Sequence, residues 1–150
     1  MKFSFTTIYG LHTVGDRKSL WHELRQLHTV QHGPWVAMRD FNAVLTEEDR
    51  INGAPIHENE TVDFKEFIQD YNMAELRSVW AQFTWSNNTV STRIYRGVGN
   101  AEWMLDYPLQ DIVIMAPYFS HHAPLAIQLM GQQNKSYRPF RVFNFIAEHA

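Results

Sequence analysis

The sequence contains no cysteine in its 150 residues. This absence excludes a disulfide framework and any zinc site built on cysteine. No apolar run approaches the roughly 18 residues that a membrane span needs, and the first residues lack the apolar core of a signal peptide. We therefore expect a soluble intracellular protein, located in the cytoplasm or the nucleus.

A strong positive charge is also missing. The formal net charge is −3 with histidine counted as neutral, and the isoelectric point is about 6.2. Proteins that hold nucleic acid electrostatically usually present a basic face. The charge therefore does not support nucleic acid as a partner, although it leaves that partner open.

The residues that are present indicate one folded domain. Hydrophobic residues make up 45% of the chain and aromatic residues 14%, which is enough to bury a core and too apolar for a disordered chain. A length of 150 residues corresponds to a single domain. We find no internal repeat and no interdomain linker.

Hydrophobic periodicity predicts two main helices, over residues 16–29 and 61–72, and a short helix that Asn100 caps and that ends before Pro108. Alternating or continuous apolar runs predict the strands. These strands span residues 2–9, 35–38, 76–80, 82–85, 92–96, 111–115 and 125–130, and a last strand or arm covers 137–145.

The segment from Trp35 to Leu45 is the most informative part of the chain. A short apolar strand follows Gly33-Pro34 and ends abruptly at Arg39, Asp40 and Asn42. Ligands in open α/β sheets bind at the carboxyl ends of strands. Asp40 and Asn42 are two residues apart and so point to the same side of an extended chain, where their oxygens suit a cation or a phosphate. The alternative is a simple Asp-x-Asn turn that closes the next loop.

Several motifs in order resemble the endonuclease/exonuclease/phosphatase superfamily, and specifically the endonuclease domain of plant-type LINE retroelements. Residues 36–45 are similar to its GDFN signature, and Tyr9-Gly10 to the end of its VYG strand. The further matches are residues 83–87 to FTWSN, 93–96 to RIDR, 120–125 to SDHxPL and 138–141 to RPFR. The resemblance covers nearly the whole chain, which matches the second half of that domain. A natural start at Met1 would therefore mean that the first half is missing.

This resemblance implies an α/β (α+β) fold. We expect one predominantly antiparallel sheet with two main helices on one face, that is, half of the superfamily's four-layer sandwich. Members of the superfamily hydrolyse phosphodiesters with Mg²⁺, which neutralises charge on the substrate. By resemblance, Asp40 is the water-activating carboxylate, Asn42 its partner and His122 the phosphate-contacting histidine, and Tyr9 contacts the substrate phosphate.

Three family groups are replaced in this chain. Arg39 stands where the family has glycine, His121 where it has the aspartate of SDH, and Tyr95 where it has the aspartate that orients the catalytic histidine. Each lost partner of a catalytic site typically costs on the order of 10- to 100-fold. Asp40 is then the one candidate metal ligand, and a weak one. Side chains expected to contact substrate are Arg39, Trp85, Asn87 and Arg93.

Three functions are compatible with this pattern. The first is a retroelement-derived domain in which Mg²⁺-dependent phosphodiester hydrolysis is weak or lost. The second is a repurposed enzyme that performs metal-free acid–base chemistry on a small organic molecule, with Asp40, His121, His122 and Tyr95 as the reacting groups and without a cofactor. In that enzyme Trp35, Trp85 and Phe119 would line an apolar site. The third is a non-catalytic binding domain.

The strands also carry apolar groups on both faces. Helices of this chain can cover one face, and the partner sheet of the intact superfamily fold would cover the other. We therefore expect a homodimer that buries the second face, because soluble monomers rarely expose apolar patches of several hundred Å².

Overall fold

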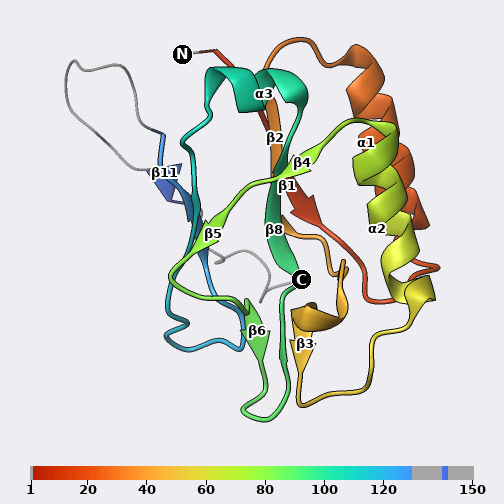
Figure 1. Cartoon of the computed structure of the whole chain (residues 1–150), viewed down its shortest axis with the longest axis vertical. Helices are drawn as coiled ribbons and strands as arrows, with labels where there is room; N and C mark the ends of the chain where they lie inside the picture. Colours follow the sequence, from red (N-terminus) through yellow and green to blue (C-terminus); the bar gives the residue numbers. More distant parts are fainter. Residues whose placement is uncertain (1, 130–139, 142–150) are drawn as a thin grey trace.

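The computed structural model describes residues 2–129 and 140–141. Within these residues the chain forms a mixed α+β structure of three helices and three small sheets. Figure 1 shows the course of the chain. Strand pairs are antiparallel, apart from the parallel pairs β1–β2 and β5–β9. The α+β class is therefore as predicted, but the strands form three small sheets and not the one predominantly antiparallel sheet that was expected.

The central sheet contains four strands in the order β1 (Ser4–Tyr9), β2 (Trp35–Asp40), β8 (Tyr95–Gly99) and β4 (Ala74–Glu75). β2 lies between two neighbours, and its residues are buried apart from one, which is partly buried. A strand covered on both faces has no alternation of apolar and polar residues, which explains the continuous apolar run in the sequence.

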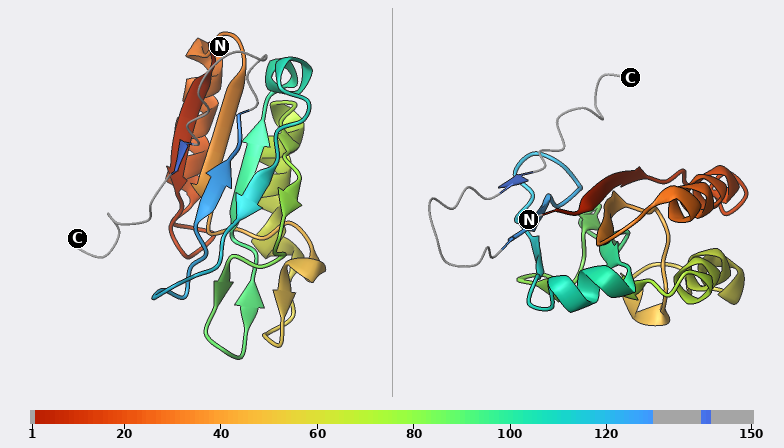
Figure 2. Two further views of the ribbon diagram at one scale, coloured as in Figure 1. Left: turned by 90° about the vertical axis from the view of Figure 1, so that its left-hand side faces the viewer. Right: turned by 90° about the horizontal axis from the view of Figure 1, so that it is seen from above.

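Helices α1 (Lys18–Val30) and α2 (Glu58–Asp70) cover one face of this sheet (Figure 2). Both begin near their predicted starts, but the boundaries differ by a few residues. Asp16 does not cap α1, because its carboxylate accepts a hydrogen bond from the Thr13 hydroxyl instead. α2 begins earlier than predicted, where the Glu60 carboxylate accepts the backbone N–H of His57.

A second sheet covers the opposite face of the central sheet. It contains β11 (Phe140–Arg141), β10 (Leu125–Ile127), β9 (Ile112–Ile114) and β5 (Ser78–Val79). Its inward apolar side chains share one core with those of β2 and β8.

The covered face corrects one expectation. Val36 and Met38 point away from the helices and are only 0% and 1% exposed within a single copy of the chain. The apolar sheet face that was expected to require a second copy is therefore already buried, and the physical argument for the homodimer no longer holds. The strands of this sheet were predicted, but their pairing into a separate layer was not, because pairing joins segments that are distant in the sequence.

A third, three-stranded sheet lies at one end of the molecule, with the strand order β3 (Arg50–Ile51), β7 (Ser91–Thr92) and β6 (Trp85–Ser86). The single strand predicted over 92–96 is divided between β7 and β8. The short helix α3 (Ala101–Asp106) forms as predicted, with the Asn100 side chain accepting the Trp103 N–H.

A buried ion pair joins the third sheet to the centre of the fold. Asp49 is the last residue of the 3₁₀ turn η1 (Glu47–Asp49), and its carboxylate accepts hydrogen bonds from the Arg96 guanidinium and from the N–H groups of Leu45 and Thr46. It is only 5% exposed. The Arg96 guanidinium also pairs with Glu75 at 2.7 Å. This loop is therefore anchored in the interior.

The last predicted strand can be compared only in part. Residues 140 and 141 pair with β10, and the rest of the expected strand or arm over 137–145 lies outside the described residues. Among the described residues, no helix has the length and apolar character needed to cross a membrane.

Candidate active site

The site begins with three side chains in one row across the central sheet. Asp40 is the register partner of Tyr9 on β1 and of Tyr95 on β8. Residues in register on neighbouring strands carry their side chains to the same face. The fold thus brings together three predicted site residues that are far apart in the sequence.

Asp40 is buried at the end of β2. Its side chain is 4% exposed, and its Oδ1 accepts the backbone N–H of Asn42 at 2.8 Å. The Asp-x-Asn turn considered from sequence is therefore present. Burial raises the pKa of Asp40 to about 6, and the Asn42 N–H and the positive charge of Arg39 offset part of this rise. Asp40 consequently titrates near pH 6.

Gly10 is required for the chain to approach Asp40 closely. Its N–H donates to the Asp40 carbonyl oxygen at 2.6 Å, and a Cβ atom at this position would overlap the Phe41 carbonyl oxygen. This contact explains the glycine of the Tyr9-Gly10 motif. Tyr9 itself is 63% exposed at the edge of the sheet, where its ring is accessible to a ligand.

Arg39 has a backbone conformation that favours glycine, with φ of 111°. A residue with a large side chain therefore stands at a position whose backbone favours glycine. The charge of Arg39 lowers the pKa of both Asp40 and His122, which places the guanidinium in the neighbourhood of both groups.

His122 is held by Tyr95. The Tyr95 hydroxyl lies 2.8 Å from Nδ1 of His122, and the two rings stack with centroids 5.4 Å apart. The pKa of His122 is lowered, first by burial and then by the positive charges of His121, Arg39 and His12. Its neutral form is therefore favoured in the folded protein.

His121 points differently from its neighbour. Its Nδ1 lies 2.8 Å from the backbone carbonyl oxygen of Ser86, which can only accept, so this nitrogen carries a proton. The side chain is exposed. The resemblance predicts a carboxylate at this position. The chain instead has a histidine that is hydrogen-bonded to strand β6.

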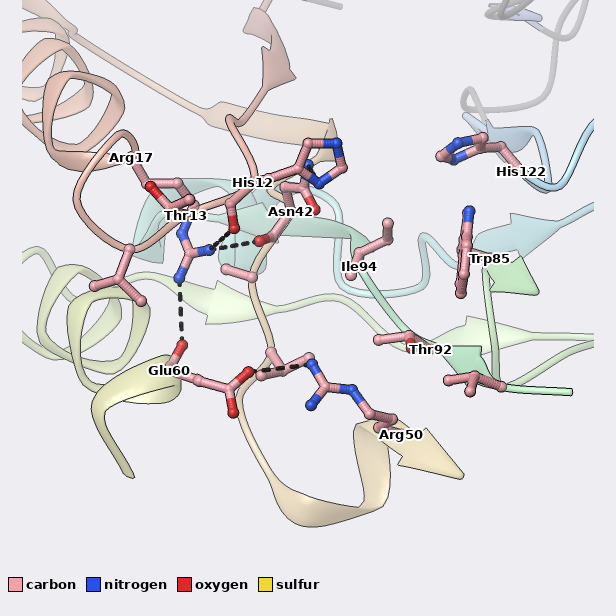
Figure 3. Close-up of a pocket in the computed structure, with 14 residues that line it drawn as sticks. His12, Thr13, Arg17, Asn42, Arg50, Glu60, Trp85, Thr92, Ile94 and His122 are labelled. Carbon is pink, nitrogen blue, oxygen red and sulfur yellow. Dashed lines mark hydrogen bonds and ion pairs between the residues drawn. The ribbon is translucent and has the colours of Figure 1, made fainter. Parts of the chain in front are cut away.

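A cleft with a volume of about 550 Å³ lies beside this cluster (Figure 3). His12 and Asn42 are on one side of it, and His122 and Trp85 are on the other. His12 was missed by sequence reasoning. Its position two residues after Gly10 is the one signal that could have identified it.

Some predicted contacts are not part of the cleft wall. Asn87 closes the turn between β6 and β7 by accepting the N–H groups of Thr89 and Val90. The Arg93 guanidinium is bonded to Glu75 and to the Ser78 hydroxyl. Both side chains therefore make hydrogen bonds within the protein. Their positions do not support the expectation that they contact substrate.

Two aromatic residues expected to line an apolar site are also placed elsewhere. Trp35 is buried in the core under the helices, with its indole N–H donating to the Thr6 hydroxyl. Phe119 is fully exposed. Among the three expected aromatic residues, Trp85 is the one that lines the cleft.

The donor set does not fit a magnesium ion. Mg²⁺ is held by carboxylate oxygens and water, and Asp40, the one candidate carboxylate, is buried and is not among the residues that line the cleft. In residues 2–129 and 140–141, no three histidine, cysteine, aspartate or glutamate side chains are grouped so that they could hold a metal ion.

Compared with known proteins, the chain matches no family model and no curated protein. The similarity to the endonuclease/exonuclease/phosphatase superfamily therefore remains an interpretation of the motifs.

Proposed function

We propose that this chain is an endonuclease/exonuclease/phosphatase-like domain that binds a phosphodiester between Asn42 and His122 and hydrolyses it slowly. The observation that carries the proposal is the 2.8 Å hydrogen bond between the Tyr95 hydroxyl and Nδ1 of His122. In the resembling family an aspartate at this motif position orients the histidine, so a tyrosine in contact with the ring preserves the positioning without the charge.

The cleft has suitable groups for an anionic ligand. Asn42 and His122 line opposite sides. The His122 ring can donate a hydrogen bond to a phosphate oxygen, whereas the two N–H groups of the Asn42 amide are directed to Gly10 and His12. The charge of Arg39 acts on the same region. Trp85 offers an aromatic face for the sugar or base next to the phosphate.

Hydrolysis is expected to be slow for two reasons. Tyr95 and His121 replace carboxylates, and each such loss costs on the order of 10- to 100-fold. Asp40 is buried, is not among the residues that line the cleft, and has a pKa raised to about 6. No step is assigned to a metal ion, because the described donor set does not fit one.

A second candidate function is acid–base chemistry on a small organic molecule. It is favoured by the pKa of Asp40, raised to about 6, and by the lowered pKa of His122. Groups that titrate near neutral pH can exchange protons with a substrate, and the cleft volume suits a small molecule. We do not propose a homodimer through the central sheet, because that face is covered within one copy.

Hydrolysis of bis(p-nitrophenyl) phosphate, with and without Mg²⁺, tests the proposal. We expect a slow reaction that Asn42→Ala and His122→Ala abolish and that the surface control Arg77→Ala leaves unchanged. Arg77 pairs with Asp111 on the surface, away from the residues that line the cleft. A wild-type rate no higher than that of His122→Ala would overturn hydrolysis at this site and leave the second candidate.

A further inference from the structure

His12 is connected to the candidate site through the Asn42 side chain. Nδ2 of Asn42 lies 3.2 Å from the Gly10 carbonyl oxygen and 3.2 Å from Nδ1 of His12. Both contacts are made by the same amide nitrogen, which has two hydrogens to donate.

These contacts determine the orientation of the amide. A flipped Asn42 would place its oxygen against the Gly10 carbonyl oxygen, and two acceptors at this distance repel. The amide N–H groups therefore donate to Gly10 and to Nδ1 of His12. Because Nδ1 of His12 accepts, the neutral imidazole carries its proton on Nε2.

The buried side chain of Arg17 fixes the positions of His12 and Asn42. One terminal nitrogen of the buried Arg17 guanidinium donates to the carbonyl oxygens of both His12, at 3.2 Å, and Asn42, at 2.8 Å. The guanidinium is itself paired with Asp63. The His12 and Asn42 backbones therefore keep a constant spacing, which a loop histidine would not otherwise have.

We propose that His12 is a phosphate-binding residue whose Nε2–H donates to a non-bridging oxygen of a phosphodiester, from the side of the cleft opposite His122. The inference rests on the proposed function, since it names a further group at the same site. A donor tautomer favours a ligand rich in acceptors, and a phosphodiester presents two anionic oxygens. Asn42 then acts as a positioning residue for His12.

The tautomer can be measured directly. In ¹⁵N-labelled protein, long-range ¹H–¹⁵N correlation of the His12 ring should show the proton on Nε2 at neutral pH. Asn42→Asp should move it to Nδ1, because a carboxylate accepts and cannot donate. The matched control is Asn87→Asp, whose oxygen can still accept from Thr89 and Val90, and it should leave the His12 tautomer unchanged.

Binding is measured with the dinucleotide thymidylyl-(3′→5′)-thymidine as the phosphodiester probe, by titration calorimetry. We expect His12→Ala to weaken binding by about 10-fold or more, as for loss of a hydrogen bond to a charged group. His12→Gln, which returns an amide N–H near the place of Nε2, should restore most of the affinity.

The outcomes separate the two proposals. If the wild-type protein does not bind the dinucleotide, the proposed function and this inference both fail. If it binds but His12→Ala binds equally well, or if the wild-type tautomer carries its proton on Nδ1, only the role of His12 is overturned. An Nε2 proton together with the loss in His12→Ala and the recovery in His12→Gln supports it.

Discussion

The Tyr95 hydroxyl lies 2.8 Å from Nδ1 of His122, although the two residues are 27 positions apart in the sequence. Tyr95 belongs to a central strand that is buried on both faces, and His122 to a loop that pairs with β6 through its bridge to Trp85. The two residues belong to different parts of the fold, one to the central sheet and one to a loop bridged to the third sheet. Their contact therefore depends on how these two sheets are placed relative to each other. This contact is the basis of the first prediction.

Tyr95→Phe removes the hydroxyl and leaves the ring in place. We expect hydrolysis of bis(p-nitrophenyl) phosphate to fall by on the order of 10- to 100-fold, because His122 loses the partner that orients it. The control is Tyr107→Phe, a ring that packs beside Trp103 away from the site. An unchanged rate in Tyr95→Phe would show that the hydroxyl does not position His122 for the reaction.

Asp40→Asn should stabilise the protein above pH 6. The folded-state pKa of Asp40 is raised from 3.8 to about 6, so the folded protein favours the neutral carboxyl. The stability from this preference is complete below about pH 4 and is lost as the pH rises through 6. The difference corresponds to roughly 3 kcal/mol.

Urea unfolding of wild type and Asp40→Asn between pH 4 and pH 8 measures this effect. The two proteins should have similar stability at pH 4, and the variant should be the more stable one at pH 8, because asparagine keeps an oxygen for the Asn42 N–H and cannot ionise. Asp111→Asn, in a surface pair with Arg77, serves as the control. Equal stabilities at pH 8 would contradict the raised pKa.

Arg39→Gly should raise the melting temperature. The backbone of Arg39 has φ of 111°, which costs a non-glycine residue about 1–3 kcal/mol, and glycine removes this cost. Loss of the guanidinium should also raise the pKa of Asp40 further, because the Arg39 charge lowers it. Thermal unfolding monitored by circular dichroism, together with an NMR titration of Asp40, checks both effects. A lower melting temperature would mean that the side-chain contacts of Arg39 outweigh the backbone strain.

Asp49→Ala should destabilise the protein strongly, by about 3–5 kcal/mol, because it removes one of the two carboxylates that pair with the buried Arg96 guanidinium and leaves only Glu75. It also removes the acceptor for the Leu45 and Thr46 N–H groups. Chemical unfolding measures the change, and Asp111→Ala, which breaks an exposed pair with Arg77, should have little effect. A small loss in Asp49→Ala would show that the loop is held mainly by other contacts.

The sequence by itself determined the elements whose side chains repeat at regular spacing. The apolar run of β2 and the periodic faces of α1 and α2 are local patterns, so these elements and the α+β class were predicted close to their observed positions. The order of the motifs also indicated that Asp40 and Asn42 would lie near His122, and the fold places Asn42 and His122 on one cleft.

Only the tertiary structure decided the contacts between distant segments. A second sheet covers Val36 and Met38, and the sequence predicted its strands without showing that they pair in a separate layer. His12 joins the site because Gly10 allows its loop to approach Asn42, 30 positions away. Local patterns report which face of an element is buried, but hydrogen-bond partners and burial-dependent pKa values depend on which segments meet in space.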